Sequence, residues 1–240
     1  MILKGMHQRK VTIFQHVRNE HGGLFEEYIR ERGMDIFHVP IDETNEILPF
    51  HSTHLLILGG PMSVNNEKEY PWLKEEKQII REWVAEGRPV LGICLGAQLI
   101  ASSIGAEVHP CQEERGWSSV ISVNPRIFPD LPLRFRVFQM HGETFEIPHK
   151  AALVFRGENV CNQGLCIGSA LGIQFHVELT IRMIQDWISC LPDQEQSFIL
   201  AQSRQYLPES ENICRIIADR FLSAAPYDFS WVHPGNGTPV

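Results

Sequence analysis

Four apolar, strand-like runs alternate with helical patterns in the first 105 residues of the chain. The strand-like runs cover residues 11–17, 34–40, 54–60 and 89–93. The helical patterns cover residues 23–33, 71–87 and 95–105. Parallel strands need long crossover connections, which are usually helices. This order therefore predicts an α/β fold, a three-layer sandwich with a mostly parallel central sheet and helices on both faces.

The pattern changes after residue 107, where short strands separated by Pro and Gly are expected. Later elements are a strand at 171–178, a helix at 180–191 capped by Thr180, and helical stretches near 193–205 and 209–224. The tail 226–240 is rich in turn residues and is expected to be irregular. We expect a single domain over residues 1–240, with its core at about 10–190 and C-terminal helices and tail at about 191–240.

Composition excludes several classes of function. The chain has 21 basic and 29 acidic residues, a net charge of −8, which argues against nonspecific nucleic-acid binding. It contains no apolar run of the roughly 20 residues that a membrane helix needs, and its first ten residues lack the apolar core of a secretory signal. Its six cysteines are scattered, which suggests reduced thiols in the cytoplasm. We expect no membrane contact, no metal and no other cofactor.

One cysteine, Cys94, stands at a sharp corner in the sequence GICLG. A strand pattern enters it and a helix pattern leaves it, while Gly92 and Gly96 remove Cβ atoms where the two elements approach. This is the pattern of a nucleophile elbow with cysteine in the serine position, which leaves the side chain exposed at the end of a central strand. The helix N-terminus favours a thiolate. The alternative is a small hydrophobe buried beneath the helix, which is common for cysteine.

A nucleophilic cysteine needs a base, and the segment GIQFHVE offers one. Alternate residues of a strand face the same side, so His176 and Glu178 are expected to be neighbours, with the carboxylate orienting the imidazole. That is the arrangement of a nucleophile, a base and an orienting group. The alternative is an ordinary polar strand face in contact with water.

An oxyanion formed at the cysteine also needs hydrogen-bond donors. The apolar run 54–60 ends in Gly59-Gly60-Pro61, at the same edge of a parallel sheet as Cys94. The N–H groups of Gly60 and Leu95 are therefore candidate donors. The alternatives are a simple turn and a phosphate cradle, but the chain has neither of the Gly-rich phosphate-binding motifs, GxGxxG and GxxxxGK[ST].

Three segments, LGGPMSV, GICLGAQLIA and GIQFHVE, resemble in this order the hallmark motifs of the class I glutamine amidotransferases, over about residues 10–190. Two further segments, VFQMHGETFEIP and RGWSSV, are similar to segments of the glutaminase part of GMP synthase and of related stand-alone proteins. Met140 and Glu143 stand where that branch usually has Trp and Asp.

The resemblance implies a role for each candidate residue. Cys94 would be the nucleophile, His176 the general base and acid, and Glu178 the group that orients His176. The substrate glutamine and the oxyanion would contact another set of residues. These are Gly60 and Leu95 for the oxyanion, Gln98 for the substrate, and the backbone around Met140 and His141 for its α-amino and carboxylate groups.

The implied reaction is hydrolysis of the side-chain amide of glutamine through a γ-glutamyl thioester, which releases ammonia and glutamate. The chain lacks the S-G-G-x-D-S pyrophosphate loop of the synthetase part of GMP synthase. Either a separate synthetase subunit docks over the end of the sheet and receives the ammonia, or the protein hydrolyses another γ-glutamyl amide or conjugate. A third hypothesis is a non-catalytic binding or thiol-sensing module on the same fold.

Overall fold

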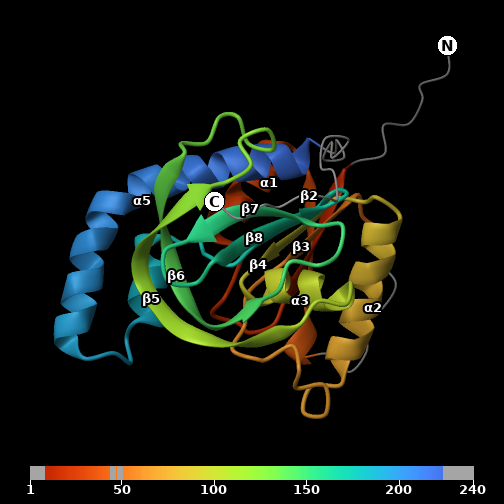
Figure 1. Cartoon of the computed structure of the whole chain (residues 1–240), viewed down its shortest axis with the longest axis horizontal. Coiled ribbons are helices and arrows are strands. Elements are labelled where there is room, and N and C mark those ends of the chain that lie inside the picture. Colours follow the sequence, from red (N-terminus) through yellow and green to blue (C-terminus); the bar gives the residue numbers. More distant parts are fainter. Residues whose placement is uncertain (1–8, 44–46, 48–50, 224–240) are drawn as a thin grey trace, which may run out of the picture.

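The computed structural model describes residues 9–43, 47 and 51–223, and its strands form one nine-stranded sheet (Figure 1). The strands, in chain order, are β1 (Lys10–Gln15), β2 (Asp35–Pro40), β3 (His54–Ile57), β4 (Val90–Ile93), β5 (Val108–Ser122), β6 (Arg134–Phe145), β7 (Ala152–Gly157), β8 (Asn162–Ile167) and β9 (Ala170–Ile173). The helices are α1 (Gly23–Glu31), α2 (Trp72–Ala85), α3 (Leu95–Ser103), α4 (Ile181–Trp187) and α5 (Asp193–Leu222), with a short 3-10 helix at Ile41–Glu43.

The sheet is mixed, so the expectation of a mostly parallel sheet is only partly right. Its order is β2-β1-β3-β4-β9-β8-β7-β5-β6, and the pairs from β2 to β9 are parallel. The pairs from β9 to β6 are antiparallel. These later strands are not separated by helices along the chain, and antiparallel strands need no crossover helix.

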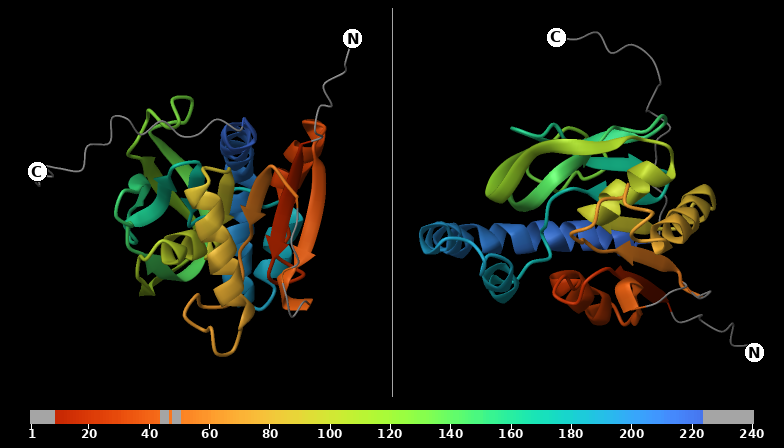
Figure 2. Two further views of the ribbon diagram at one scale, coloured as in Figure 1. Left: turned by 90° about the vertical axis from the view of Figure 1, so that its right-hand side faces the viewer. Right: turned by 90° about the horizontal axis from the view of Figure 1, so that it is seen from below.

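Helices cover both faces of the sheet, as the three-layer prediction requires, and Figure 2 shows them on its two sides. On one face α1 and α5 pack against alternate residues of β1 and β4, such as Ile13 and Leu91. On the other face α2 and α3 pack against the intervening residues, such as Phe14 and Val90. A third apolar cluster joins α4 and the first half of α5 to β5 and β6. The central parallel strands β1, β3, β4 and β9 are buried on both faces, which explains their mostly apolar sequences, whereas the edge strand β2 is largely exposed.

The two C-terminal helical stretches expected from the sequence form one helix, α5, of 30 residues with Pro208 inside it. Proline lacks an N–H group and its ring crowds the carbonyl one turn back, so it bends a helix when packing holds both halves. Figure 1 shows this bend. The expected Thr180 cap is present, since its hydroxyl accepts a bond from Met183 N at 3.3 Å. The expected irregular tail at 226–240 lies outside the described residues.

Within the described part of the chain, no helix has both the length and the apolar character that crossing a bilayer demands. All six cysteines lie in this part and are free thiols.

A buried histidine gives the fold a testable pH dependence. The His54 side chain is buried, lies edge-on to Phe221 with ring centroids 5.2 Å apart, and has Arg9 nearby. Burial and the charge of Arg9 lower the pKa of His54 to about 4. In the unfolded chain the pKa of histidine is about 6.5. Between these values the unfolded state binds a proton that the folded state does not, so stability falls as the pH falls.

We expect the wild type to lose about 3 kcal/mol of unfolding free energy from this residue between pH 7 and pH 4. Urea unfolding of wild type and His54→Leu at both pH values measures it, because other groups titrate in both proteins and cancel in the difference. A pH dependence that is the same in the two proteins would contradict the expectation.

Candidate functional site

The chain turns sharply at Cys94, between the end of β4 and the start of α3, as the sequence predicted. Cys94 has φ 52° and ψ −106°, a conformation that residues other than glycine rarely adopt. A Cβ atom on Gly92 would lie 2.4 Å from the Gly96 carbonyl oxygen, and one on Gly96 would lie 2.3 Å from the Ile57 carbonyl oxygen. Both glycines are therefore required by the close approach of the helix to the strands.

The Cys94 side chain is more buried than the sequence suggested. It is 7% exposed and packs within the main apolar core, whereas an exposed side chain was expected. The sulfur is covered because β6 and the segment after β9 pass over the turn. Cys94 Sγ lies 3.8 Å from the Met140 carbonyl oxygen and 3.7 Å from Gln174 Nε2. Cys94 nevertheless borders a cavity, so a small molecule there is within reach of the sulfur.

His176 and Glu178 follow β9 and are not part of it, contrary to the expected strand over 171–178. Strand β9 ends at Ile173. The chain then leaves β8 and pairs with β6, where His176 N donates to Phe138 O at 2.8 Å and Phe138 N donates to His176 O at 3.3 Å. The expected pairing of the two side chains is present all the same, with His176 Nδ1 2.7 Å from Glu178 Oε1.

The imidazole of His176 is held from several sides. The second carboxylate oxygen of Glu178 accepts a bond from Val177 N at 2.9 Å, so both oxygens face donors. The Trp187 ring lies edge-on to the imidazole, with centroids 4.9 Å apart, and its Nε1 donates to Asn19 O at 3.0 Å. These contacts fix the orientation of the ring with Nδ1 toward the carboxylate.

The charge state of His176 follows from its neighbours. Burial lowers the pKa of His176, but the carboxylate of Glu178 and the neighbouring Cys94 outweigh it and raise the pKa well above the usual range. A second carboxyl, that of Glu20, lies near His176 and Glu178, and burial raises the pKa of Glu20. A protonated imidazole next to Cys94 is suited to giving a proton to a leaving amine.

Gly60 and Leu95 lie close together beside Cys94. Gly60 follows β3 and borders the same cavity as Cys94. A Cβ atom on Gly60 would lie 2.9 Å from Leu95 Cδ2. Leu95 is the first residue of α3, where backbone N–H groups have no partner within the helix. The two expected oxyanion donors therefore come from neighbouring segments.

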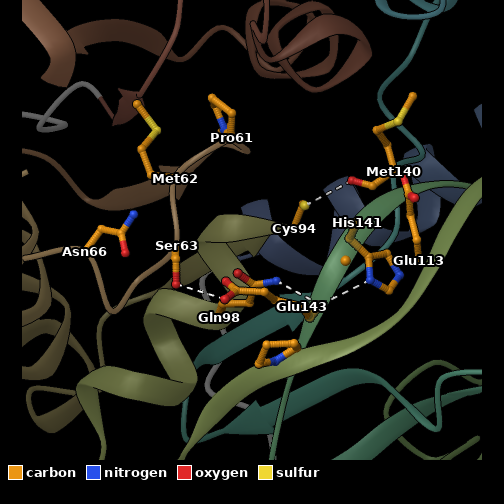
Figure 3. A pocket seen from close by; sticks show the side chains of 13 residues that line it. Pro61, Met62, Ser63, Asn66, Cys94, Gln98, Glu113, Met140, His141 and Glu143 are labelled. Carbon is orange, nitrogen blue, oxygen red and sulfur yellow. Dashed lines mark hydrogen bonds between the residues drawn. The ribbon is translucent and has the colours of Figure 1, made fainter. Parts of the chain in front are cut away.

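The cavity has a volume of about 520 Å³, within the usual range for small-molecule sites (Figure 3). Five of the residues chosen from the sequence line it, namely Gly60, Cys94, Gln98, Met140 and His141. The other lining residues are Pro61, Met62, Ser63, Asn66, Pro110, Glu113, Gly142 and Glu143.

Hydrogen bonds fix one wall of this cavity, which β6 forms. Gln98 Nε2 donates to Glu143 O at 3.1 Å, and Ser63 Oγ donates to Glu143 Oε1 at 2.9 Å (Figure 3). His141 Nδ1 lies 3.1 Å from the same Glu143 carbonyl, and its Nε2 lies 3.2 Å from the buried carboxylate of Glu114. The backbone from Met140 to Glu143 is therefore held in place from both sides.

Sequence reasoning missed a further buried pair, His16 and Glu76, behind the Gly59–Gly60 segment. His16 Nε2 lies 3.1 Å from Glu76 Oε1, and both side chains are fully buried. A signal was present, because Glu76 stands on the apolar stripe of α2 between Leu73 and Ile80. A charged residue at such a position is expected to have a buried partner.

The comparisons with known proteins agree with this geometry. The family model described as glutamine amidotransferase class-I matches residues 23–186, which include the Cys94 turn and the pair His176 and Glu178. The chain belongs to the class-I glutamine amidotransferase family. Among solved structures, this family member resembles a glutamine amidotransferase from Thermotoga maritima, with 33% identity and a TM-score of 0.83 over 90% of this chain and 99% of that one. A glutamine amidotransferase from Methylobacillus flagellatus has 25% identity and a TM-score of 0.82, over 95% and 100% of the two chains.

Two kinds of protein are found among the curated relatives of this amidotransferase. A GMP synthase from Thermomicrobium roseum is 35% identical over 146 residues, 59% of this chain and 26% of that protein. The putative glutamine amidotransferase-like protein YfeJ from Salmonella typhimurium is 25% identical over 82% of this chain and 86% of its own length. The chain thus spans only about a quarter of that GMP synthase, and the match to one from Thermosipho melanesiensis covers 37% of it.

Proposed function

We propose that this class-I amidotransferase hydrolyses the side-chain amide of glutamine through a thioester on Cys94. The observation that carries the proposal is the position of Cys94. Cys94 stands at a strand-to-helix corner, borders a cavity, and lies beside His176, a histidine that a buried carboxylate orients. A packed core has no need of that combination of groups, whereas acyl transfer needs each of them.

The proposed reaction has two steps. The Cys94 thiolate attacks the amide carbon, and the N–H groups of Gly60 and Leu95 stabilise the oxyanion that forms. His176 gives a proton to the amide nitrogen, the carbon–nitrogen bond breaks, and ammonia leaves a γ-glutamyl thioester. Water then attacks the thioester and loses a proton to His176. The carbon–sulfur bond breaks, releasing glutamate and restoring the thiolate and imidazolium.

A second candidate substrate class is a larger γ-glutamyl amide or conjugate. The cavity of about 520 Å³ extends beyond Cys94 to Glu113 and Glu143, which offers space for a substrate larger than free glutamine. A separate synthetase subunit that receives ammonia is the other proposal for the physiological role, prompted by the GMP synthases among the relatives.

Steady-state release of ammonia or amine tests the proposal. The purified chain is incubated with glutamine and, in parallel, with a panel of γ-glutamyl amides and peptides, and glutamate is measured as the common product. We expect turnover of at least one γ-glutamyl compound, with the highest kcat/KM identifying the substrate class. If no γ-glutamyl compound is hydrolysed, with or without a candidate synthetase, the proposal is wrong and a binding module is favoured.

A further inference from the structure

Behind the cavity wall, a buried histidine and glutamate hold the peptide between Gly59 and Gly60. We propose that His16, held by Glu76, is a positioning residue that turns this peptide so that the Gly60 N–H points toward Cys94. The inference rests on the proposed function, in which Gly60 supplies an oxyanion donor.

His16 follows β1 directly, and its ring is fully buried. Its Nδ1 lies 3.0 Å from the Gly59 carbonyl oxygen, and its Nε2 lies 3.1 and 3.2 Å from the two carboxylate oxygens of Glu76 on α2. The ring also stacks on Trp72, with centroids 5.5 Å apart and planes 28° apart. Each ring nitrogen therefore has a polar partner and one face of the ring is covered by Trp72, so the imidazole is held in a single orientation.

The Gly59 carbonyl and the Gly60 N–H belong to one planar trans peptide, in which they point in opposite directions. Because His16 holds the carbonyl on its side, the N–H faces away from His16. A Cβ atom built on Gly59 would lie 3.4 Å from His176 Cε1 and 3.7 Å from Cys94 Cβ, so this segment also lies against those residues. The peptide thus lies between His16 and the proposed nucleophile.

Two glycines in succession make this peptide easy to rotate, since neither has a side chain to resist it. Rotation of this peptide would reverse the directions of the Gly59 carbonyl and the Gly60 N–H. The carbonyl oxygen would then point at the cavity, where it would repel an oxyanion. The hydrogen bond from His16 opposes that rotation. A buried ion pair is weak evidence for a stabilising role, so a role in holding this peptide is the better explanation for the pair.

The bonding pattern also specifies the protonation of His16. A carbonyl only accepts hydrogen bonds, so Nδ1 must carry a proton, and a carboxylate at Nε2 requires a second one. Burial lowers the pKa of His16, but Glu76, the Gly59 carbonyl and, from the loop after β1, Glu20 together raise it above the usual range. The imidazolium that the geometry requires is therefore favoured.

Two matched double variants test the inference, His16→Leu with Glu76→Gln and His16→Asn with Glu76→Gln. The Glu76→Gln change avoids leaving an unpaired buried charge, and the asparagine amide offers an N–H near the position of Nδ1. We expect the leucine variant to lose about 10²-fold in kcat with KM within about twofold of wild type, because an oxyanion donor acts only in the transition state. We expect the asparagine variant to recover most of that loss. Equal loss in both, or a loss confined to KM, would overturn the inference.

Crystal structures of both variants give a readout that does not depend on turnover. In the leucine variant we expect the Gly59–Gly60 peptide to be rotated or to adopt two orientations, and in the asparagine variant to keep the orientation described above. An unchanged peptide in the leucine variant would overturn the inference even if kcat falls. If the wild type hydrolyses no γ-glutamyl compound, the proposed function fails, and these structures still decide whether His16 holds the peptide.

Discussion

Changing Cys94 to alanine is expected to reduce kcat for the γ-glutamyl substrate by at least about 10⁴-fold, because no other group replaces the attacking sulfur. Substrate binding should survive, since the cavity walls formed by Gln98 and β6 are unchanged. Steady-state kinetics measures the first effect, and calorimetric titration of the variant with substrate measures the second. The exposed Cys190, changed to alanine, serves as the control and should keep wild-type kcat.

The same variant separates catalysis from packing. Cys94 is buried, but alanine removes only one sulfur atom, so we expect a loss of unfolding free energy below the roughly 2–5 kcal/mol typical of large buried truncations. Thermal unfolding of the two proteins measures it. Unchanged kcat in Cys94→Ala would contradict the mechanism, and a large drop in Tm would show that the cysteine acts mainly as a packed core residue.

Changes at His176 and Glu178 are expected to follow an order. His176→Ala should nearly abolish turnover, because the imidazole is the group that the mechanism assigns to proton transfer; in a comparable triad the loss is about 10⁶-fold, against about 10⁴-fold for the orienting carboxylate. Glu178→Gln should therefore keep about 10²-fold more activity than His176→Ala.

The loss in Glu178→Gln has a structural reason. Both carboxylate oxygens of Glu178 accept bonds, one from His176 Nδ1 and one from Val177 N. A glutamine can accept only one of them, and its amide N–H groups would face the other donor. The kcat values of the two variants, measured with the same substrate, give the order. If Glu178→Gln is as inactive as His176→Ala, or has wild-type kcat, the orienting role is wrong.

The parallel half of the fold and the Cys94 turn could be predicted because local patterns specify them. Runs such as 55–60 and 89–93 are apolar throughout, which is typical of strands buried on both faces. Gly92 and Gly96 mark the close approach of strand and helix, and the structure gives the contacts that require them. The pairing of His176 with Glu178 was also predictable from their spacing, although their strand ends earlier.

The antiparallel half depends on pairings between distant segments and was less predictable. Strand β5 runs for 15 residues and includes the polar stretch from Cys111 to Arg115, where its pairing with β6 is irregular between Pro110 and Glu114 and resumes beyond it. Helix α5 continues through Pro208, since both of its halves are packed against the sheet or against α4. The pair of His16 and Glu76 joins residues 60 positions apart, which no local pattern in the sequence specifies.

The most direct test of a glutamine site around Cys94 is trapping with 6-diazo-5-oxo-norleucine, an electrophilic analogue of glutamine. The reactivity of the other five cysteines determines how selective the labelling of Cys94 can be. Burial raises the pKa of Cys111 to about 11 and raises the pKa of Cys166 and Cys214 well above the usual range, so these thiols should react slowly. Cys161 and Cys190 are exposed and are the competitors against which selectivity is judged.

Intact mass and peptide mapping of the treated protein give the result. We expect one adduct per chain, on Cys94, formed at low reagent and suppressed by added glutamine, because the analogue and glutamine would occupy one cavity. Modification spread over Cys161 and Cys190, or an adduct on Cys94 that neither glutamine nor any other γ-glutamyl compound suppresses, would show that no γ-glutamyl site surrounds this cysteine.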